Sequence, residues 1–163
     1  MPWASWLLFH AVHWRARRGL RDEDPSQHAP QPSAQQRKQI SRQTGIRGET
    51  YAYWYLRRLG YVFVARNYHP RSAKGEIDMI GYDGEVLAFV EVRTRTLRAE
   101  LTALPELSVT TAKQHLLVRT AKFFLLERHI KPCPMRFDVL AIDNELGAPP
   151  VVRLHKDAFS PQI

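Results

Sequence analysis

The sequence predicts an α/β protein in which a mixed β-sheet is flanked by helices. Apolar residues recur at helical spacing in two stretches, 41–59 and 109–129. The other apolar stretches are β-branched or aromatic, and we read them as strands at 61–67, 136–142 and 150–154 and a hairpin at 75–95. The order helix, strand, hairpin, helix, strand, strand is typical of a mixed sheet with helices on its faces.

A length of 163 residues suits one domain with a tail. We place an N-terminal extension and linker at residues 1–40 and the folded domain at 41–159. Residues 19–39 are rich in Pro, Gln, Ser and charge without a helical or strand period, which is typical of a flexible linker. The net charge of +8 and pI near 10.0 favour polyanionic partners, such as nucleic acid or an acidic membrane surface.

The first residues need a separate interpretation. Trp3 to Trp14 is aromatic and apolar, is followed by arginines, and is shorter than the roughly 20 apolar residues that span a bilayer. We favour a disordered extension, because His10 and His13 interrupt the apolar surface, over an interfacial helix with weak membrane association. The single cysteine, Cys133, excludes an intrachain disulfide, and we expect a cytoplasmic protein.

The first predicted helix ends at Gly60 and carries Glu49 in line with Ala52, Tyr53 and Leu56. A carboxylate on this core-facing stripe is costly unless another group pairs with it. The alternative is a solvated Glu49 that benefits from the helix dipole in the first turns. Both interpretations stay open on the residues alone.

The hairpin reads GEIDMIGYDGEVLAFVEVRTR, and its Asp83-Gly84 pair predicts a two-residue turn. Tyr82 then faces Glu85, Asp78 faces Phe89 and Glu76 faces Glu91. Side chains alternate along strands, so one face carries Glu76, Asp78, Glu91 and Arg93, and the other carries Ile77, Met79, Val86, Ala88, Val90 and Val92.

Asp78 and Glu91 are diagonal neighbours in this register, and two such carboxylates suit a magnesium ion that also binds water or phosphate. The alternative is a solvated face on which the acids pair with Arg93 and Arg95. Ile80, Leu87 and Phe89 share the face with the charges. We therefore expect both faces to be covered and the carboxylates to lie in a cleft.

Basic residues flank this hairpin. They gather before it and after it, at the end that holds Glu76 and Glu91, as Arg66, His69, Arg71, Lys74, Arg95 and Arg98. Such a ring would bind a phosphate backbone around a metal site, although a surface that only balances its charges would look similar.

Two other charged residues lie on predicted secondary structure. Lys113 is on the inward stripe of the second helix, which Thr110 or Thr111 can cap, and it can meet a phosphate or a carboxylate or extend to solvent. For Asp138, inside an apolar strand, we favour a structural role. No histidine spacing predicts a zinc site, and neither a phosphate-binding glycine loop nor a nucleophile elbow is present. These absences leave carboxylates and basic side chains as the candidates for any catalytic site.

The segments RGETYAYWYLRRLGY, RNY, GEID, EVRTR and RFDV, in this order, resemble the YraN-like family of uncharacterised bacterial proteins over residues 45–158. That family is similar to the PD-(D/E)XK nucleases, which have a restriction-endonuclease-like fold, and to archaeal Holliday junction resolvases. The resemblance implies that Asp78 and Glu91 are the two motif acids and that Glu49 completes the site. It also implies that the carbonyl of Val92 is a further ligand of Mg²⁺ or Mn²⁺.

The resemblance implies a metal-dependent nuclease acting on DNA, with branched or repair intermediates among its substrates. Arg93 stands where the family has its motif lysine. Arginine supplies charge but cannot act as a base, so Lys74 or Lys113 would have to replace that lysine. The alternative is a nucleic-acid-binding protein with a degenerate site. Nucleic-acid contacts are expected at Arg66, Arg71, Lys74, Arg95, Arg98 and Lys113, and a homodimer is left open.

Overall fold

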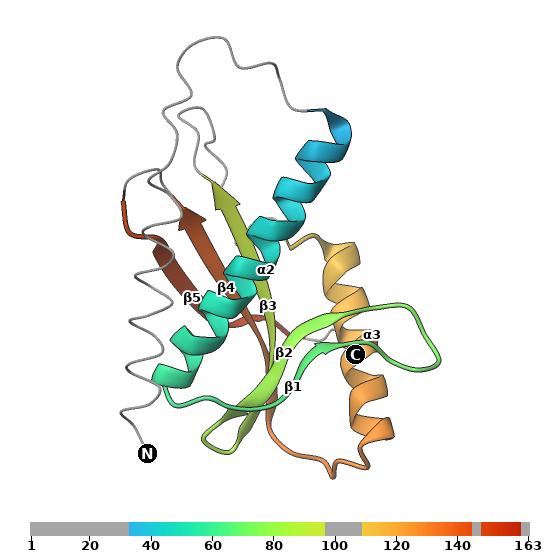
Figure 1. Cartoon of the computed structure of the whole chain (residues 1–163). Coiled ribbons are helices and arrows are strands. Elements are labelled where there is room, and N and C mark those ends of the chain that lie inside the picture. Colours follow the sequence, from blue (N-terminus) through green and yellow to red (C-terminus); the bar gives the residue numbers. More distant parts are fainter. Residues whose placement is uncertain (1–32, 97–108, 145–147, 161–163) are drawn as a thin grey trace.

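The structure is a computed structural model that describes residues 33–96, 109–144 and 148–160. Its elements are α2 (Ala34–Arg58), β1 (Val62–Tyr68), β2 (Ile77–Asp83), β3 (Val86–Thr96), α3 (Thr111–Glu127), β4 (Met135–Asn144) and β5 (Val151–Phe159). The five strands form one sheet in the order β1-β2-β3-β4-β5, in which only the β3–β4 pair is parallel. The predicted fold class is therefore confirmed, with α3 in the connection between the two parallel strands (Figure 1).

The first helix begins earlier than its predicted start at residue 41. It starts at Ala34, where Ser33 and Gln36 form a capping box: each side chain binds the other residue's backbone N–H. The composition of residues 34–39 resembles a linker, but the cap supplies a local helix start. Every residue from 33 to 43 is exposed, and Figure 1 shows the N-terminal turns of α2 extending beyond the strands.

The predicted hairpin register is wrong by two residues. Asp83 pairs with Val86, Tyr82 with Leu87 and Ile80 with Phe89, so the turn is Gly84-Glu85. Gly84 has a φ of 62°, and a turn with glycine first requires only this one positive φ, whereas the predicted Asp-Gly turn requires two. A two-residue shift preserves the face of each side chain, so the separation of charged and apolar faces survives.

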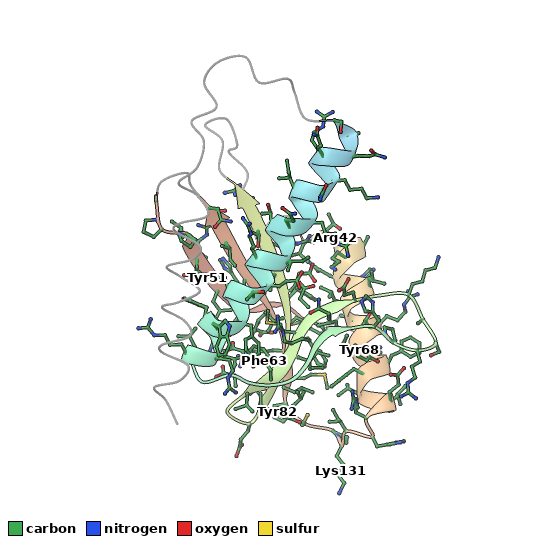
Figure 2. The ribbon with its side chains drawn as sticks, viewed as in Figure 1. Arg42, Tyr51, Phe63, Tyr68, Tyr82 and Lys131 are labelled. Carbon is green, nitrogen blue, oxygen red and sulfur yellow. The ribbon has the colours of Figure 1, made fainter. Side chains whose placement is uncertain are left out.

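The two faces of the sheet hold separate apolar clusters, each covered by one helix. Under α3, Ile80, Leu87 and Phe89 pack with Leu117, Phe124 and Phe137. Under α2, Met79, Ala88 and Val90 pack with Tyr51, Leu56 and Leu140. The expectation that both faces are covered is thus confirmed (Figure 2).

One apolar residue of the hairpin was assigned to the wrong cluster. Ile77 lies in the cluster under α3, together with its β1 partner Tyr68, and is beyond Met79, where the β2–β3 pairing ends. Thr110 caps α3, as one of the two predicted candidates.

No helix within the described ranges is long and apolar enough to cross a membrane. The predictions for Trp3 to Trp14 and for Arg98 fall outside the described residues.

Candidate functional site

Asp78 and Glu91 lie on neighbouring strands at the end of the hairpin ladder. The last β2–β3 pair is Met79–Val90, and the same register puts residues 78 and 91 next to each other across the strands. They are therefore opposite each other and not diagonal, as the shifted register requires. The Asp78 carboxylate accepts the backbone N–H of Val92 at 2.6 Å, which fixes its orientation toward β3.

Both carboxyl groups are in an environment that favours their protonated forms. Burial and then the charge of Glu91 raise the pKa of Asp78 from 3.8 to about 7. Burial also raises the pKa of Glu91, whose side chain is only 4% exposed, although Lys113 acts in the opposite direction. Two neighbouring acids with raised pKa values are typical of functional sites.

Two cations contact Glu91 from different elements. Lys113 Nζ, from the first turn of α3, lies 3.0 Å from Glu91 Oε1, and Arg93 Nη2 lies 3.4 Å from the same oxygen. The second oxygen, Oε2, is buried and has no hydrogen-bond partner among the described residues, and neither has Arg93 Nε. The carboxylate therefore has one oxygen held by cations and one oxygen available to a further ligand.

Glu49 approaches this pair from α2. Asn67, at the end of β1, donates from Nδ2 to Glu49 Oε2 at 3.1 Å, and the charge of Glu49 contributes to the raised pKa of Asp78. Gly48 allows α2 to approach β3 closely, because a Cβ there would collide with the Thr94 hydroxyl. Glu49 is half-buried and hydrogen-bonded, so it is not fully solvated, and it forms no ion pair with another residue that the structure describes.

A divalent cation fits part of this arrangement. In the described ranges, no three His, Cys, Asp or Glu side chains come close enough together to form a metal site by themselves. Magnesium, however, is commonly held by one or two carboxylates and retains several waters. Asp78, the unpartnered Glu91 Oε2 and the two raised pKa values meet that requirement, because a cation would stabilise the charged forms of both acids. The Val92 carbonyl remains a predicted ligand.

The residues predicted to contact nucleic acid have a range of partners in the structure. Lys113 contacts Glu91, but Arg95 forms a 2.6 Å ion pair with the buried Asp143, which also binds Arg153. Arg66 lies over the Tyr53 ring at 4.5 Å. The backbone N–H of Arg71 binds Glu127, and the backbone carbonyl of Lys74 accepts a hydrogen bond from Arg119. His69 lies 3.4 Å from Glu76.

Asp138 has the structural role that we expected. It is fully buried and binds the Tyr61 hydroxyl at 2.8 Å, Arg136 at 2.9 Å and the backbone N–H of Asp157 at 3.0 Å. Burial, followed by the neighbouring Asp138 charge, raises the pKa of Tyr61 far above its usual range. This network also includes Asp83 and lies apart from the Asp78–Glu91 pair.

The sequence interpretation missed Asn67 as a partner of Glu49. Asn67 has a φ of 48°, a left-handed conformation that asparagine adopts more readily than most residues. Asparagine at the end of an aromatic and β-branched strand was the available signal, but only the fold shows which helix the amide meets. The Asp143 ion pairs were also missed: Arg95 is 48 residues away in the sequence, and Arg153 lies on the next strand, β5.

Comparisons with known proteins place this site within one family. The model of the "Uncharacterised protein family UPF0102" matches residues 48–142, which include Glu49, Asp78, Glu91 and Lys113. A UPF0102 protein of Koribacter versatilis is 40% identical over 116 residues, which are 71% of this chain and 78% of that protein. One from Symbiobacterium thermophilum is 42% identical over 120 residues, or 74% and 98% of the two chains. The family resemblance drawn from the sequence is confirmed, and the names of these relatives state no activity.

Proposed function

We propose that this chain, which belongs to the uncharacterised protein family UPF0102, is a metal-dependent nuclease that hydrolyses phosphodiester bonds in DNA. The observation that supports the proposal most directly is the pairing of the half-buried Asp78 with the buried Glu91, which has a lysine at 3.0 Å and one carboxylate oxygen without a hydrogen-bond partner among the described residues. The sequence resemblance to PD-(D/E)XK nucleases supports the same reaction.

Each side chain has a distinct role in this proposal. Asp78 and Glu91 hold Mg²⁺ or Mn²⁺, with Glu49 as a nearby third acid. When bound, the cation polarises the phosphodiester and makes an attacking water more acidic. Arg93 supplies fixed positive charge to the phosphate as negative charge develops on it.

Lys113 replaces the motif lysine in this arrangement. Arg93 occupies the family's lysine position in sequence, and its guanidinium cannot act as a base. Lys113 reaches the same carboxylate from α3 and can change protonation state, which arginine cannot do. A lysine there can orient a water through hydrogen bonds and exchange a proton with it. Lys74, the other residue considered for this role, shows no described contact with Glu91.

Cleavage assays with the full-length protein test this proposal. Wild type, Glu91→Gln and Glu85→Gln are incubated with single-stranded, duplex and branched DNA, with Mg²⁺, with Mn²⁺ or with EDTA. Glu85 is an exposed acid in the hairpin turn and serves as the matched control. We expect cleavage by wild type and Glu85→Gln only when the metal is present, and none by Glu91→Gln. Cutting in EDTA, or cutting by Glu91→Gln, contradicts the mechanism.

A second candidate is a non-catalytic nucleic-acid-binding protein, which one contact favours. The Lys113 ammonium group pairs with Glu91 at 3.0 Å, so the acid has a structural partner within the chain. This candidate predicts DNA binding that persists in EDTA and no product after long incubation. The Arg93→Lys variant separates the two candidates. Cleavage that appears only in this variant identifies a degenerate site, whereas equal cleavage by wild type supports the nuclease.

A further inference from the structure

The helix face that carries Glu49 to the candidate site continues beyond the sheet as a basic stripe. Lys38, Arg42, Gly45 and Glu49 follow one another at intervals of four, three and four residues along α2. These intervals put them on one face of a helix. We call Lys38 and Arg42 the α2 stripe, and Figure 2 labels Arg42 on the projecting half of the helix.

The N-terminal half of α2 is basic, and its turns before residue 44 have little packing to support them. Residues 34–48 contain Arg37, Lys38, Arg42 and Arg47 and no acidic residue. Among the residues that the structure describes, none of these four side chains forms an ion pair, and residues 33–43 are all exposed. An isolated helix of this length is marginal in water, and a run of unneutralised cations lowers its stability further. A polyanion bound to this half would remove that repulsion.

The spacing along the helix suits a nucleic-acid strand that leaves the candidate site. At about 1.5 Å per residue, Arg42 lies roughly 10 Å and Lys38 roughly 17 Å along the axis from Glu49. One strand of a duplex has a phosphate about every 3.4 Å of axis. The two cations therefore match phosphates about three and five nucleotides from the one nearest Glu49.

We propose that the α2 stripe binds the phosphate backbone of the nucleic acid whose scissile bond lies at Asp78 and Glu91. The inference rests on the proposed function for the position of that scissile bond. The contact itself requires only a polyanionic strand that passes the acids. Backbone contacts of this kind position a substrate without reading its sequence.

The test compares two double variants of the full-length protein with equal loss of charge. Lys38→Gln/Arg42→Gln removes the stripe, and Arg37→Gln/Arg47→Gln removes two cations from other faces of the same helix segment. Affinity for a fluorescent DNA duplex is measured in EDTA over a series of salt concentrations. Each lost phosphate contact lowers the slope of log K against log salt by about 0.9. We expect a decrease of about 1.8 for the stripe variant and less than half of that for the control.

Several results overturn the proposal. One is an equal slope of log K against log salt in the two double variants, and another is no DNA binding by the wild type. A third is a change of sedimentation mass in the stripe variant alone. The last result would show that the stripe contacts a second copy of the chain. Circular dichroism checks that both variants retain the helix.

If the wild type binds DNA and the variants show the expected slopes, but the wild type never cuts, the nuclease proposal fails and the stripe proposal stands. If the wild type cuts and the slopes are equal, the nuclease stands and the stripe proposal fails.

Discussion

Lys113, at the start of α3, contacts Glu91 in the middle of β3, with 3.0 Å between Nζ and Oε1. Thr110 caps this helix and accepts the backbone N–H of Lys113 itself, so the cap fixes the position from which the lysine extends. The connection from β3 through α3 to the parallel strand β4 thus returns a cation to the carboxylate that β3 presents.

Replacement of this lysine should separate metal binding from cleavage. In Lys113→Met the positive charge beside Glu91 is lost, so affinity for Mn²⁺ should be unchanged or higher. Cleavage should fall by about 10²–10⁴-fold, the usual contribution of a positioned acid or base. Calorimetric titration with Mn²⁺ and the cleavage assay measure the two effects. Lys122→Met changes an exposed position on the same helix and is the control. If Lys113→Met loses Mn²⁺ binding and cleavage in parallel, Lys113 has a structural role only.

Stability without divalent cations should decrease as the pH rises from about 4 to about 7. Over this range the native state holds a proton on Asp78, whose pKa is raised to about 7, while the unfolded chain has released it. Because the native state binds more protons, the free energy of unfolding falls with increasing pH. Urea denaturation at several pH values measures the slope. Asp78→Asn should flatten it, and Mg²⁺ should stabilise wild type more at pH 8 than at pH 5. Identical slopes in wild type and Asp78→Asn would refute the assignment.

The elements and their faces were predictable because their signals are local. The helical stripe through Ala52 and Leu56, and the alternation through Ile80, Leu87 and Phe89, each lie within one stretch of sequence. The hairpin register was less secure, since Asp83-Gly84 and Gly84-Glu85 are both acceptable turns. The side chains of the paired residues kept their faces only because the two registers differ by an even number of residues, and Ile77, beyond the last β2–β3 pair, did not keep its face.

The contacts between elements could not be predicted in the same way. Sequence spacing put Lys113 on an inward stripe but did not show whether it meets a carboxylate, a phosphate or solvent. That choice depends on how far α3 lies from β3, to which the packing of Phe124 against Phe89 contributes. The start of α2 at Ala34 was missed for another reason: a Ser-to-Gln capping box lies within a composition that resembles a linker.

Replacement of Asp138 should lower the stability of the protein and leave its cleavage rate unchanged. Asp138→Ala leaves Arg136 and the Tyr61 hydroxyl without their shared buried partner. Breaking a buried ion pair in this way costs about 3–5 kcal/mol. Urea denaturation should show this loss, while the cleavage rate per folded molecule stays unchanged. Glu85→Ala, on the surface, should change stability by less than about 0.5 kcal/mol. A cleavage defect in the folded fraction of Asp138→Ala would place this acid in the reaction.

Close approach of α2 to β3 should depend on the absence of a side chain at residue 48. In Gly48→Ala the new methyl group would overlap the Thr94 hydroxyl, so the helix or the strand must shift. We expect a loss of about 1–3 kcal/mol from overpacking. Because Glu49 follows directly, its hydrogen bond with Asn67 should weaken as well. Thermal and urea denaturation measure the stability, and the cleavage assay reports on Glu49.

Two further variants isolate this contact from the general effect of alanine in a helix. Gly45→Ala lies in the same helix, and its Cβ meets no atom within 4 Å. It should stabilise the protein by up to about 1 kcal/mol, because alanine has the higher helix propensity. Thr94→Ala removes the hydroxyl that the new methyl group would overlap, but it keeps the Cβ at 2.8 Å from that methyl group, so it should restore only part of the stability lost in Gly48→Ala. If Gly48→Ala and Gly45→Ala have the same effect, α2 does not depend on the contact with Thr94, and the position of Glu49 has another cause.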